Sequence, residues 1–327
     1  MRSMPSRLTP VLGLLLLGAT LVGCSHWPEV APHDSTSAPP ASAAAPPTSF
    51  EPQWVQLPSG DATTPMLPAW WWPVSSAQPS PLVVLLHGCG GMFSGSERGE
   101  QRVGSERALS TRFKHYAALL HAQGWQVLIV DSLTPRGERE LCTQRLSQRR
   151  VHQGHRRADA LAALRWAAQQ PGVDPQRLAL MGWSHGGSAV LSSLNARYPE
   201  VRQSPVRPAA AVAYYPGCEA ERQRGFEPSA PLWLMLGADD DWTAPEPCVA
   251  LAREAQGPHA VQAQLFEGAV HGFDSTAPVR LRRDVPNGTR PGQGVHVGGQ
   301  PAALAASEAL LLQVLRNALA VPGTASH

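Results

Sequence analysis

The sequence carries little net charge and almost no lysine. Its 327 residues have a formal net charge of +2, and Lys114 is the only lysine among the 27 basic residues. Without a lysine-rich tract or a strongly basic balance, nothing in the sequence indicates a nucleic-acid partner. Arginines do cluster between Arg136 and Arg157, with Glu138 and Glu140 interleaved, and this pattern favours a solvated face over an anion-binding rim.

The spacings typical of metal and phosphate sites are also missing. No pair of cysteines has the spacing of zinc ligands. The G-x-G-x-x-G and P-loop spacings are absent, so the glycine-rich segments are not expected to cradle a phosphate. Asp239, Asp240 and Asp241 could together bind a divalent cation, but no further set of acidic ligands is suggested nearby. We therefore expect neither a metal nor an organic cofactor.

The first 24 residues have the pattern of an export signal. A positively charged start precedes an apolar stretch at 8–22, which is too short for a membrane-spanning helix. The stretch ends in Leu21-Val22-Gly23-Cys24, which resembles the lipobox of bacterial lipoproteins. Acylation of Cys24 would then anchor the protein to a lipid membrane, and Ser25 favours the outer membrane, facing the periplasm. An ordinary secretory signal and an uncleaved helix are the alternatives.

Residues 25–52 differ in composition from the rest of the chain. Proline, alanine, serine and threonine fill most positions, so this segment cannot bury enough apolar surface to offset its ordering entropy. We expect an extended, mobile tether there. The folded part is expected as one domain over residues 53–322.

Four cysteines remain once Cys24 is set aside. An even number of cysteines in an exported protein suggests disulfides, and four cysteines permit three pairings, among which the sequence alone does not choose. We favour Cys218 with Cys248 and Cys89 with Cys142. In each pair, both members should lie beyond the carboxyl ends of neighbouring strands.

Apolar runs of strand length alternate with helix-length segments along the folded part. This alternation predicts an α/β fold with a mostly parallel central sheet and helices on both faces. The stretch 280–299 is rich in glycine and proline and is expected to be a loop. The expected strands lie at 54–57, 67–72, 82–86, 125–131, 178–181, 209–215, 232–236 and 261–266, and the expected helices at 105–123, 151–170, 185–197, 246–256 and 302–319.

The segment Gly182-Trp183-Ser184-His185-Gly186 follows directly on an apolar strand. The G-x-S-x-G spacing is typical of a nucleophile elbow, in which a sharp strand-to-helix turn lifts the serine hydroxyl above the sheet. A glycine-rich loop without chemistry is the alternative. Because a serine hydroxyl is almost wholly protonated at neutral pH, Ser184 needs a general base.

In folds of this kind the base follows the nucleophile and an acid along the chain. His271 stands just beyond the last expected strand and is the candidate base. The acid should follow the strand at 232–236, where Asp239, Asp240 and Asp241 are adjacent. One of these carboxylates would accept the imidazole N–H and stabilise the imidazolium that forms.

The developing oxyanion should be stabilised by two backbone N–H groups. One belongs to His185, the residue after the nucleophile. The other is expected in His87-Gly88-Cys89-Gly90-Gly91, where the glycines let the backbone turn inward and the Cys89 N–H is the natural donor. A glycine-rich turn without a role is the alternative. The pocket should lie at the carboxyl end of the sheet, and its candidate substrate-binding walls are Arg136, Trp183, Tyr215 and Trp242.

Over residues 80–320 the sequence resembles the dienelactone hydrolase family of α/β-hydrolases. The matching segments are His87-Gly88-Cys89-Gly90-Gly91, Asp131-Ser132 with Pro135-Arg136-Gly137, Gly182-Trp183-Ser184-His185-Gly186-Gly187, Tyr215-Pro216-Gly217-Cys218, Asp240-Asp241-Trp242-Thr243 and His271-Gly272-Phe273-Asp274.

The resemblance implies a single-domain α/β-hydrolase fold and hydrolysis of a small ester or lactone. It places the acid at Asp240, with Asp241 as second choice and Asp239 as third. Members named for lactone hydrolysis use a cysteine nucleophile, whereas this chain has Ser184, which favours more ordinary esters. An oligopeptidase-type serine peptidase and a lipoprotein that uses the fold only for binding are the rival readings.

Overall fold

The computed structural model describes residues 51–94 and 109–321. The expected export signal at 1–24, with the lipidation site Cys24, lies outside these residues. So do all but the last two residues of the expected tether at 25–52. The bounds of the expected domain, 53–322, stay a prediction.

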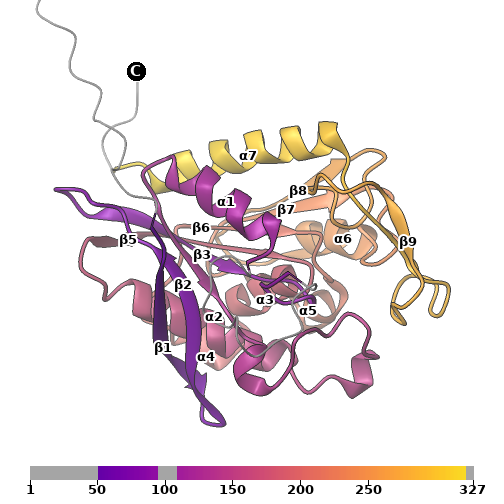
Figure 1. Cartoon of the computed structure of the whole chain (residues 1–327), viewed down its shortest axis with the longest axis horizontal. Coiled ribbons are helices and arrows are strands. Elements are labelled where there is room, and N and C mark those ends of the chain that lie inside the picture. Colours follow the sequence, from indigo (N-terminus) through magenta and orange to yellow (C-terminus); the bar gives the residue numbers. More distant parts are fainter. Residues whose placement is uncertain (1–50, 95–108, 322–327) are drawn as a thin grey trace, which may run out of the picture. The chain divides into compact units, whose positions relative to one another are not determined.

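The central sheet has eight strands in the order β1-β2-β4-β3-β5-β6-β7-β8. Strand β2 runs antiparallel to β1 and β4, and all the other neighbours pair in parallel (Figure 1). The strands are β1 (Gln53–Asp61), β2 (Thr64–Trp72), β3 (Ser80–Leu86), β4 (Gln126–Val130), β5 (Val173–Trp183), β6 (Ala210–Tyr214), β7 (Leu232–Gly237) and β8 (Val261–Phe266).

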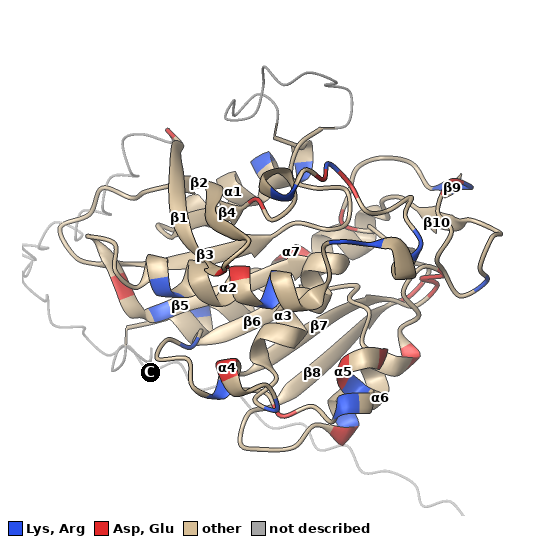
Figure 2. Ribbon diagram, turned by 90° about the horizontal axis from the view of Figure 1, so that it is seen from below, with Lys and Arg blue, Asp and Glu red and all other residues tan. Residues whose placement is uncertain are grey.

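Helices cover both faces of this sheet. On one face, α1 and α7 contribute to an apolar cluster with Phe113 and Leu311, and on the other α2 and α3 contribute to a second cluster with Leu164 and Leu191. Figure 2 shows α2 and α3 in front of the strands. The helices are α1 (Thr111–His121), α2 (Gln153–Ala167), α3 (His185–Leu194), α4 (Pro199–Arg202), α5 (Glu219–Arg224), α6 (Glu246–Glu254) and α7 (Pro301–Leu319).

Burial on both faces explains the composition of the central strands. Every residue of β3, Ser-Pro-Leu-Val-Val-Leu-Leu, is buried, as expected for a parallel strand with a helix layer on either side. Helix α7 is long and apolar enough by length and composition to cross a membrane. Its residues Ala303, Leu311 and Leu315 are buried in the core, however, which identifies it as a packing helix of the fold.

The predicted α/β fold and all eight predicted strands are confirmed. The expected loop at 280–299 is wrong in part, because β9 (Arg280–Arg282) and β10 (Val295–Val297) pair there as an antiparallel hairpin. Strands of three residues are too short to produce a clear alternation of apolar and polar residues. Helix α1 starts at Thr111, later than the predicted helix at 105–123, and residues 105–108 lie outside the described part.

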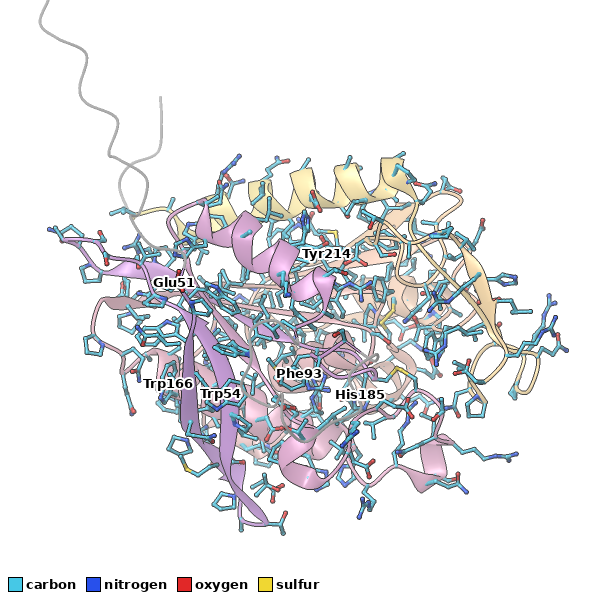
Figure 3. The ribbon with its side chains drawn as sticks, in the orientation of Figure 1. Glu51, Trp54, Phe93, Trp166, His185 and Tyr214 are labelled. Carbon is cyan, nitrogen blue, oxygen red and sulfur yellow. A yellow bond between two sulfur atoms is a disulfide. The ribbon has the colours of Figure 1, made fainter. Side chains whose placement is uncertain are left out.

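Both predicted disulfides are confirmed. Cys89 is bonded to Cys142, and Cys218 is bonded to Cys248, with Cα atoms 5.0 Å apart in each pair (Figure 3). Disulfides are typical of proteins that fold in an oxidising compartment outside the cytoplasm.

Candidate active site

Ser184 stands alone between the end of β5 and the start of α3. Its φ of 52° lies in the left-handed region, which is strained for a residue with a side chain. The neighbouring glycines allow this turn to pack tightly. A Cβ on Gly182 would lie 2.4 Å from the Gly186 carbonyl oxygen, and one on Gly186 would lie 2.2 Å from the Leu86 carbonyl oxygen. The strand-turn-helix predicted around Ser184 is therefore present, with its glycines required by contact.

Ser184, His271 and Asp240 form one hydrogen-bonded chain. His271 Nε2 lies 3.0 Å from Ser184 Oγ, and His271 Nδ1 lies 2.8 Å from Asp240 Oδ2. A carboxylate can only accept, so Nδ1 carries the proton and Nε2 is free to accept from the serine hydroxyl. The structure brings the three predicted side chains together, and their catalytic role stays a prediction.

The loop after β7 presents Asp240, and not its neighbours, to His271. Asp240 is buried, and its carboxylate also accepts hydrogen bonds from the N–H groups of Trp242 (2.8 Å) and Thr243 (2.9 Å). The Asp241 carboxylate instead contacts His296 in β10, with Oδ2 2.7 Å from Nδ1. Asp239 is exposed. This arrangement agrees with the first choice made from the sequence.

The two N–H groups predicted for an oxyanion hole, those of Cys89 and His185, make no hydrogen bond within the described part of the chain. His185 opens α3, where the first N–H groups of a helix have no partner inside the helix. Cys89 lines the pocket next to Ser184. N–H groups left free in this way can donate hydrogen bonds to a negatively charged oxygen.

His87 fixes the orientation of the Cys89 N–H. Burial and the nearby Arg156 hold the pKa of His87 well below its usual value, so the ring is neutral. The Ser132 N–H donates to Nε2 (3.2 Å), which leaves Nδ1 protonated to donate to the Gly88 carbonyl (2.7 Å). Because a trans peptide is planar, a Gly88 carbonyl held on one side points the Cys89 N–H to the other.

The pocket is a cavity of about 260 Å³ above the carboxyl ends of the parallel strands. Three predicted wall residues, Trp183, Tyr215 and Trp242, line it together with Ser184 and His271. The rings of Tyr215 and Trp242 lie 4.5 and 4.6 Å from the His271 ring, centroid to centroid. Aromatic side chains therefore hold the imidazole from two sides.

Arg136, the fourth predicted wall residue, does not line the pocket, and this prediction is wrong. Its guanidinium makes two hydrogen bonds of 2.8 Å to Asp159 and a third of 3.0 Å to Asp61, and the side chain is only 8% exposed. Hydrogen bonds from Thr63 and Arg136 lower the pKa of Asp61 to about 2. Arg136 thus joins β1 to α2 through buried ion pairs.

The expectation that the arginine cluster forms a solvated face is also wrong for Arg156. This side chain is fully buried, donates to the His87 carbonyl (2.8 Å), and lies 3.1 Å from His185 Nδ1. Burial lowers the pKa of Arg156 to about 10, which leaves it charged at neutral pH. Arg156 and Asp159 are three residues apart on the buried side of α2, a signal present in the sequence but weak among so many arginines.

Asp274 is a buried carboxylate with four donors that the sequence did not reveal. It accepts hydrogen bonds from Trp183 Nε1 (2.7 Å) and Tyr215 OH (2.7 Å), and from two residues of α1, Tyr116 OH and Arg112 Nη2 (both 3.1 Å). Burial raises the pKa of both tyrosines well above 10, so each phenol stays protonated and donates. The one sequence signal was the position of Asp274, three residues after His271.

The β9–β10 hairpin closes one side of the pocket. Arg280, Arg282 and Val297 of the hairpin line it, and the Asp241–His296 contact ties the hairpin to the loop after β7. The charged residues lining the pocket are Arg112, Arg280 and Arg282, and no carboxylate lines it among the described residues. The rim of the pocket is therefore cationic.

No group of three or more histidine, cysteine, aspartate or glutamate side chains suited to a metal ion occurs within residues 51–94 and 109–321. The expected absence of a metal or cofactor stays a prediction.

The strand order, the turn at Ser184 and the free N–H groups beside it define an α/β-hydrolase fold. The model of the dienelactone hydrolase family matches residues 76–286, more than half of the chain, and the protein belongs to that family. A comparison with curated proteins finds no match.

Solved structures with the same fold have distant sequences. A dienelactone hydrolase-like promiscuous phosphotriesterase from metagenomic libraries is 18% identical with a TM-score of 0.57, over 81% of this chain and 98% of that one. Thermogutta terrifontis esterase 2, phosphorylated by paraoxon, is 18% identical with a TM-score of 0.52, over 81% and 94%. The acylaminoacyl peptidase of Pyrococcus horikoshii is 14% identical with a TM-score of 0.53, over 85% of this chain but 43% of that one.

Proposed function

We propose that this protein is a serine hydrolase that cleaves a carboxylic ester or lactone through a covalent acyl-enzyme. The observation that carries the proposal is the chain of hydrogen bonds from Ser184 through His271 to Asp240 at the base of a pocket. This order of donor and acceptor is what a serine nucleophile requires.

In the first half of the reaction, His271 Nε2 takes the Ser184 proton as Oγ attacks the ester carbonyl carbon. The carbonyl oxygen becomes an oxyanion that accepts from the N–H groups of Cys89 and His185. When the C–O bond to the alcohol breaks, His271 returns its proton to the leaving oxygen. Asp240 holds the imidazole in the required tautomer and stabilises its charged form.

In the second half, water takes the place of the alcohol. His271 accepts a proton from the water, whose oxygen attacks the acyl carbon and regenerates the same oxyanion. The bond to Ser184 Oγ then breaks, the proton returns to Ser184, and a carboxylic acid leaves. No step requires a group that these residues do not provide.

The pocket favours a small ester that carries negative charge. A cavity of about 260 Å³ admits a compact acyl group, and Trp183, Tyr215 and Trp242 offer aromatic surface to it. Arg112 is neutralised by Asp274, and Arg282 lies 2.6 Å from Asp284, whereas Arg280 is exposed with no ion pair in the described part of the chain. Arg280 is therefore the residue available for an anionic substrate group.

A panel of substrates tests this function. We expect p-nitrophenyl esters of short acyl length to be hydrolysed, and esters with a carboxylate on the acyl chain to have a lower KM than neutral esters of equal length. Lactones, carbohydrate acetates and peptide substrates complete the panel. Turnover of peptides alone would favour the peptidase reading, and no Ser184-dependent turnover of any substrate would favour a binding lipoprotein.

We further propose that the protein is exported and anchored to the outer membrane through acylated Cys24, facing the periplasm. The support is the lipobox-like sequence that ends at Cys24, the composition of residues 25–52, which is rich in proline, alanine and serine, and two disulfides in the folded part. Intact mass of the mature protein tests this proposal: we expect a diacylated N-terminal cysteine, and loss of membrane association in Cys24→Ala. An unmodified mature N-terminus would refute it.

A further inference from the structure

The proposed oxyanion donor Cys89 belongs to a glycine-rich loop with one internal hydrogen bond, from the Gly91 N–H to the Gly88 carbonyl (3.2 Å). Gly88, Gly90 and Gly91 surround Cys89, and glycine has the largest backbone freedom of any residue. A donor contributes most to catalysis when it is held in place before the reaction starts. The position of the Cys89 N–H must therefore be set largely from outside residues 88–91.

Two groups supply that support: the His87 ring, which holds the Gly88 carbonyl, and the segment Arg139–Cys142, which holds Cys89 itself. The Leu141 N–H donates to the Cys89 carbonyl (2.7 Å), and the Cys89 side chain is bonded to Cys142. Gly91 packs against the same segment, because a Cβ there would lie 2.8 Å from the Arg139 carbonyl oxygen. The loop is thus tied to this segment by one hydrogen bond, one close contact and one covalent bond.

The apolar cluster beneath this contact is small. It holds five buried residues, namely Cys89, Leu133, Leu141, Cys142 and Val151, so the disulfide itself supplies two of the five. Trp242, which packs against this cluster, also contacts the His271 ring. Besides the two cysteines, three buried apolar side chains and the partly buried Trp242 hold the segment under the loop.

The second disulfide provides a natural contrast. Cys218 and Cys248 lie in the large apolar cluster beneath the sheet, with α2, α3 and α6, and neither lines the pocket. Cys89 and Cys142 are each 5% exposed and both line the pocket. One disulfide thus supports the core, and the other supports the wall beside Ser184.

We propose that Cys142 is a positioning residue, whose bond to Cys89 holds the Cys89 N–H where the oxyanion forms. This inference rests on the proposed serine-hydrolase function. Loss of the bond leaves the N–H in the chain but loosens its position, so the transition state loses stabilisation while substrate binding changes little. The expected signature is a fall in kcat at nearly constant KM.

Because the two disulfides differ in solvent exposure, we expect them to be reduced at different rates. A small dithiol that enters the pocket can attack a sulfur of the Cys89–Cys142 bond as a thiolate and form a mixed disulfide. Its second thiol then displaces the protein sulfur, giving two protein thiols and one cyclic disulfide of the reagent. The Cys218–Cys248 bond should react more slowly, because Cys218 is only 2% exposed and Cys248 is 0% exposed.

Matched double variants test the proposal. Cys89→Ala/Cys142→Ala removes the bond but keeps the backbone N–H at residue 89, and we expect kcat to fall about 10-fold or more with KM changed by less than about 3-fold; losing an oxyanion donor entirely costs about 10²–10³. Cys218→Ala/Cys248→Ala should keep kcat within about 2-fold while its melting temperature falls. A folded Cys89→Ala/Cys142→Ala variant with the kcat of the wild type would overturn the inference.

A second measurement tests the proposal even if the Cys89→Ala/Cys142→Ala variant folds poorly. Wild-type protein treated with dithiothreitol is followed by mass spectrometry after thiol alkylation, with kcat measured at each time. We expect kcat to fall as the Cys89–Cys142 bond opens and to recover on reoxidation. Full activity with that bond open contradicts the inference alone, whereas wild type without Ser184-dependent turnover contradicts the proposed function itself.

Discussion

Two walls of the pocket are held by different kinds of bond. The Asp274 wall consists of Arg112, Trp183 and Tyr215, which line the pocket and, with the buried Tyr116 behind them, donate to one buried carboxylate. The disulfide wall consists of residues 87–91 and 139–142, joined at Cys89–Cys142 over a small apolar cluster. The first wall faces the proposed base and nucleophile, and the second carries the proposed oxyanion donor.

The difference follows from what each wall has beneath it. Asp274 sits against the large cluster under α1 and α7, where a buried charge is stable only if it is fully hydrogen-bonded. The disulfide wall joins the loop after β3 to the long connection between β4 and α2, and the apolar cluster beneath it is small. A covalent bond compensates there for missing apolar contacts. Substitutions that remove the bonds of one wall should therefore have different effects from substitutions that remove the bonds of the other.

The largest effect is expected at the proposed acid, which belongs to neither wall. In Asp240→Asn the amide oxygen would keep accepting from the Trp242 and Thr243 N–H groups, and the amide NH2 would face His271 Nδ1. This favours the wrong tautomer of His271 and removes the charge that stabilises the imidazolium, and we expect kcat to fall by about 10⁴-fold. Asp241→Asn, which only frees the hairpin contact with His296, should reduce kcat/KM by less than about 10-fold. Steady-state kinetics on one p-nitrophenyl ester decide between the two neighbours, and equal losses would argue against the assignment of Asp240.

Removing the Asp274 carboxylate should lower both kcat and the free energy of unfolding. Asp274→Asn removes the charge that four donors share and loosens Tyr215 and Trp183 beside His271 and Ser184. We expect the free energy of unfolding to fall by about 3 kcal/mol, the lower end for a broken buried pair because Arg112 is 31% exposed. Kinetics should show a loss of kcat of about 10-fold or more.

Urea denaturation followed by tryptophan fluorescence measures the first of these quantities. Cys89→Ala/Cys142→Ala, assayed in parallel, should show the rate loss at nearly constant KM. If Asp274→Asn kept both its stability and its kcat, the carboxylate would not be what holds this wall.

An ion pair that belongs to neither wall and does not line the pocket provides a reference. Arg136→Ala leaves Asp159 buried and without its bidentate partner, so we expect the free energy of unfolding to fall by about 3 kcal/mol. The KM for any hydrolysed ester should stay unchanged, because Arg136 does not line the pocket. A several-fold increase in KM in the folded variant would restore Arg136 as a substrate-binding residue.

The smallest effect is expected at the rim. Arg280→Gln removes an exposed charge of the β9–β10 hairpin, and we expect KM for a carboxylate-bearing ester to rise by about 2- to 5-fold. The neutral ester of equal length is the control and should be unaffected. Raising the ionic strength should reduce the difference between wild type and variant, because salt screens exposed charges. Equal changes for both esters would show that Arg280 does not recognise charge.

Local patterns were enough to predict the sheet, Ser184 and His271, whereas the choice of Asp240 among three adjacent aspartates came from the resemblance to the dienelactone hydrolase family. The apolar run of β3, the glycines around Ser184 and the strand-ending position of His271 are each visible within a few residues of sequence. Both disulfides could be predicted as well, because parallel strands bring their carboxyl ends to one edge of the sheet.

The rest depended on contacts between distant segments. Arg136 ends a short 3-10 helix and Arg280 begins the short strand β9, and only the positions of Asp61 and Asp159 show that the Arg136 side chain is covered. Asp274 acquires its role from α1, which is more than 150 residues earlier in the chain. The β9–β10 hairpin needs Asp241 as an anchor, which a scan for alternating residues cannot show.

Labelling of Ser184 by a fluorophosphonate tests the central claim most directly. The folded wild-type protein should react in a 1:1 ratio, with the modified peptide containing Ser184, and Asp240→Asn should react far more slowly. Heat-denatured protein and Ser184→Ala are the controls and should not react. A folded wild type that is not labelled at Ser184, while a known serine esterase in the same tube is, would contradict the assignment of this residue as a nucleophile.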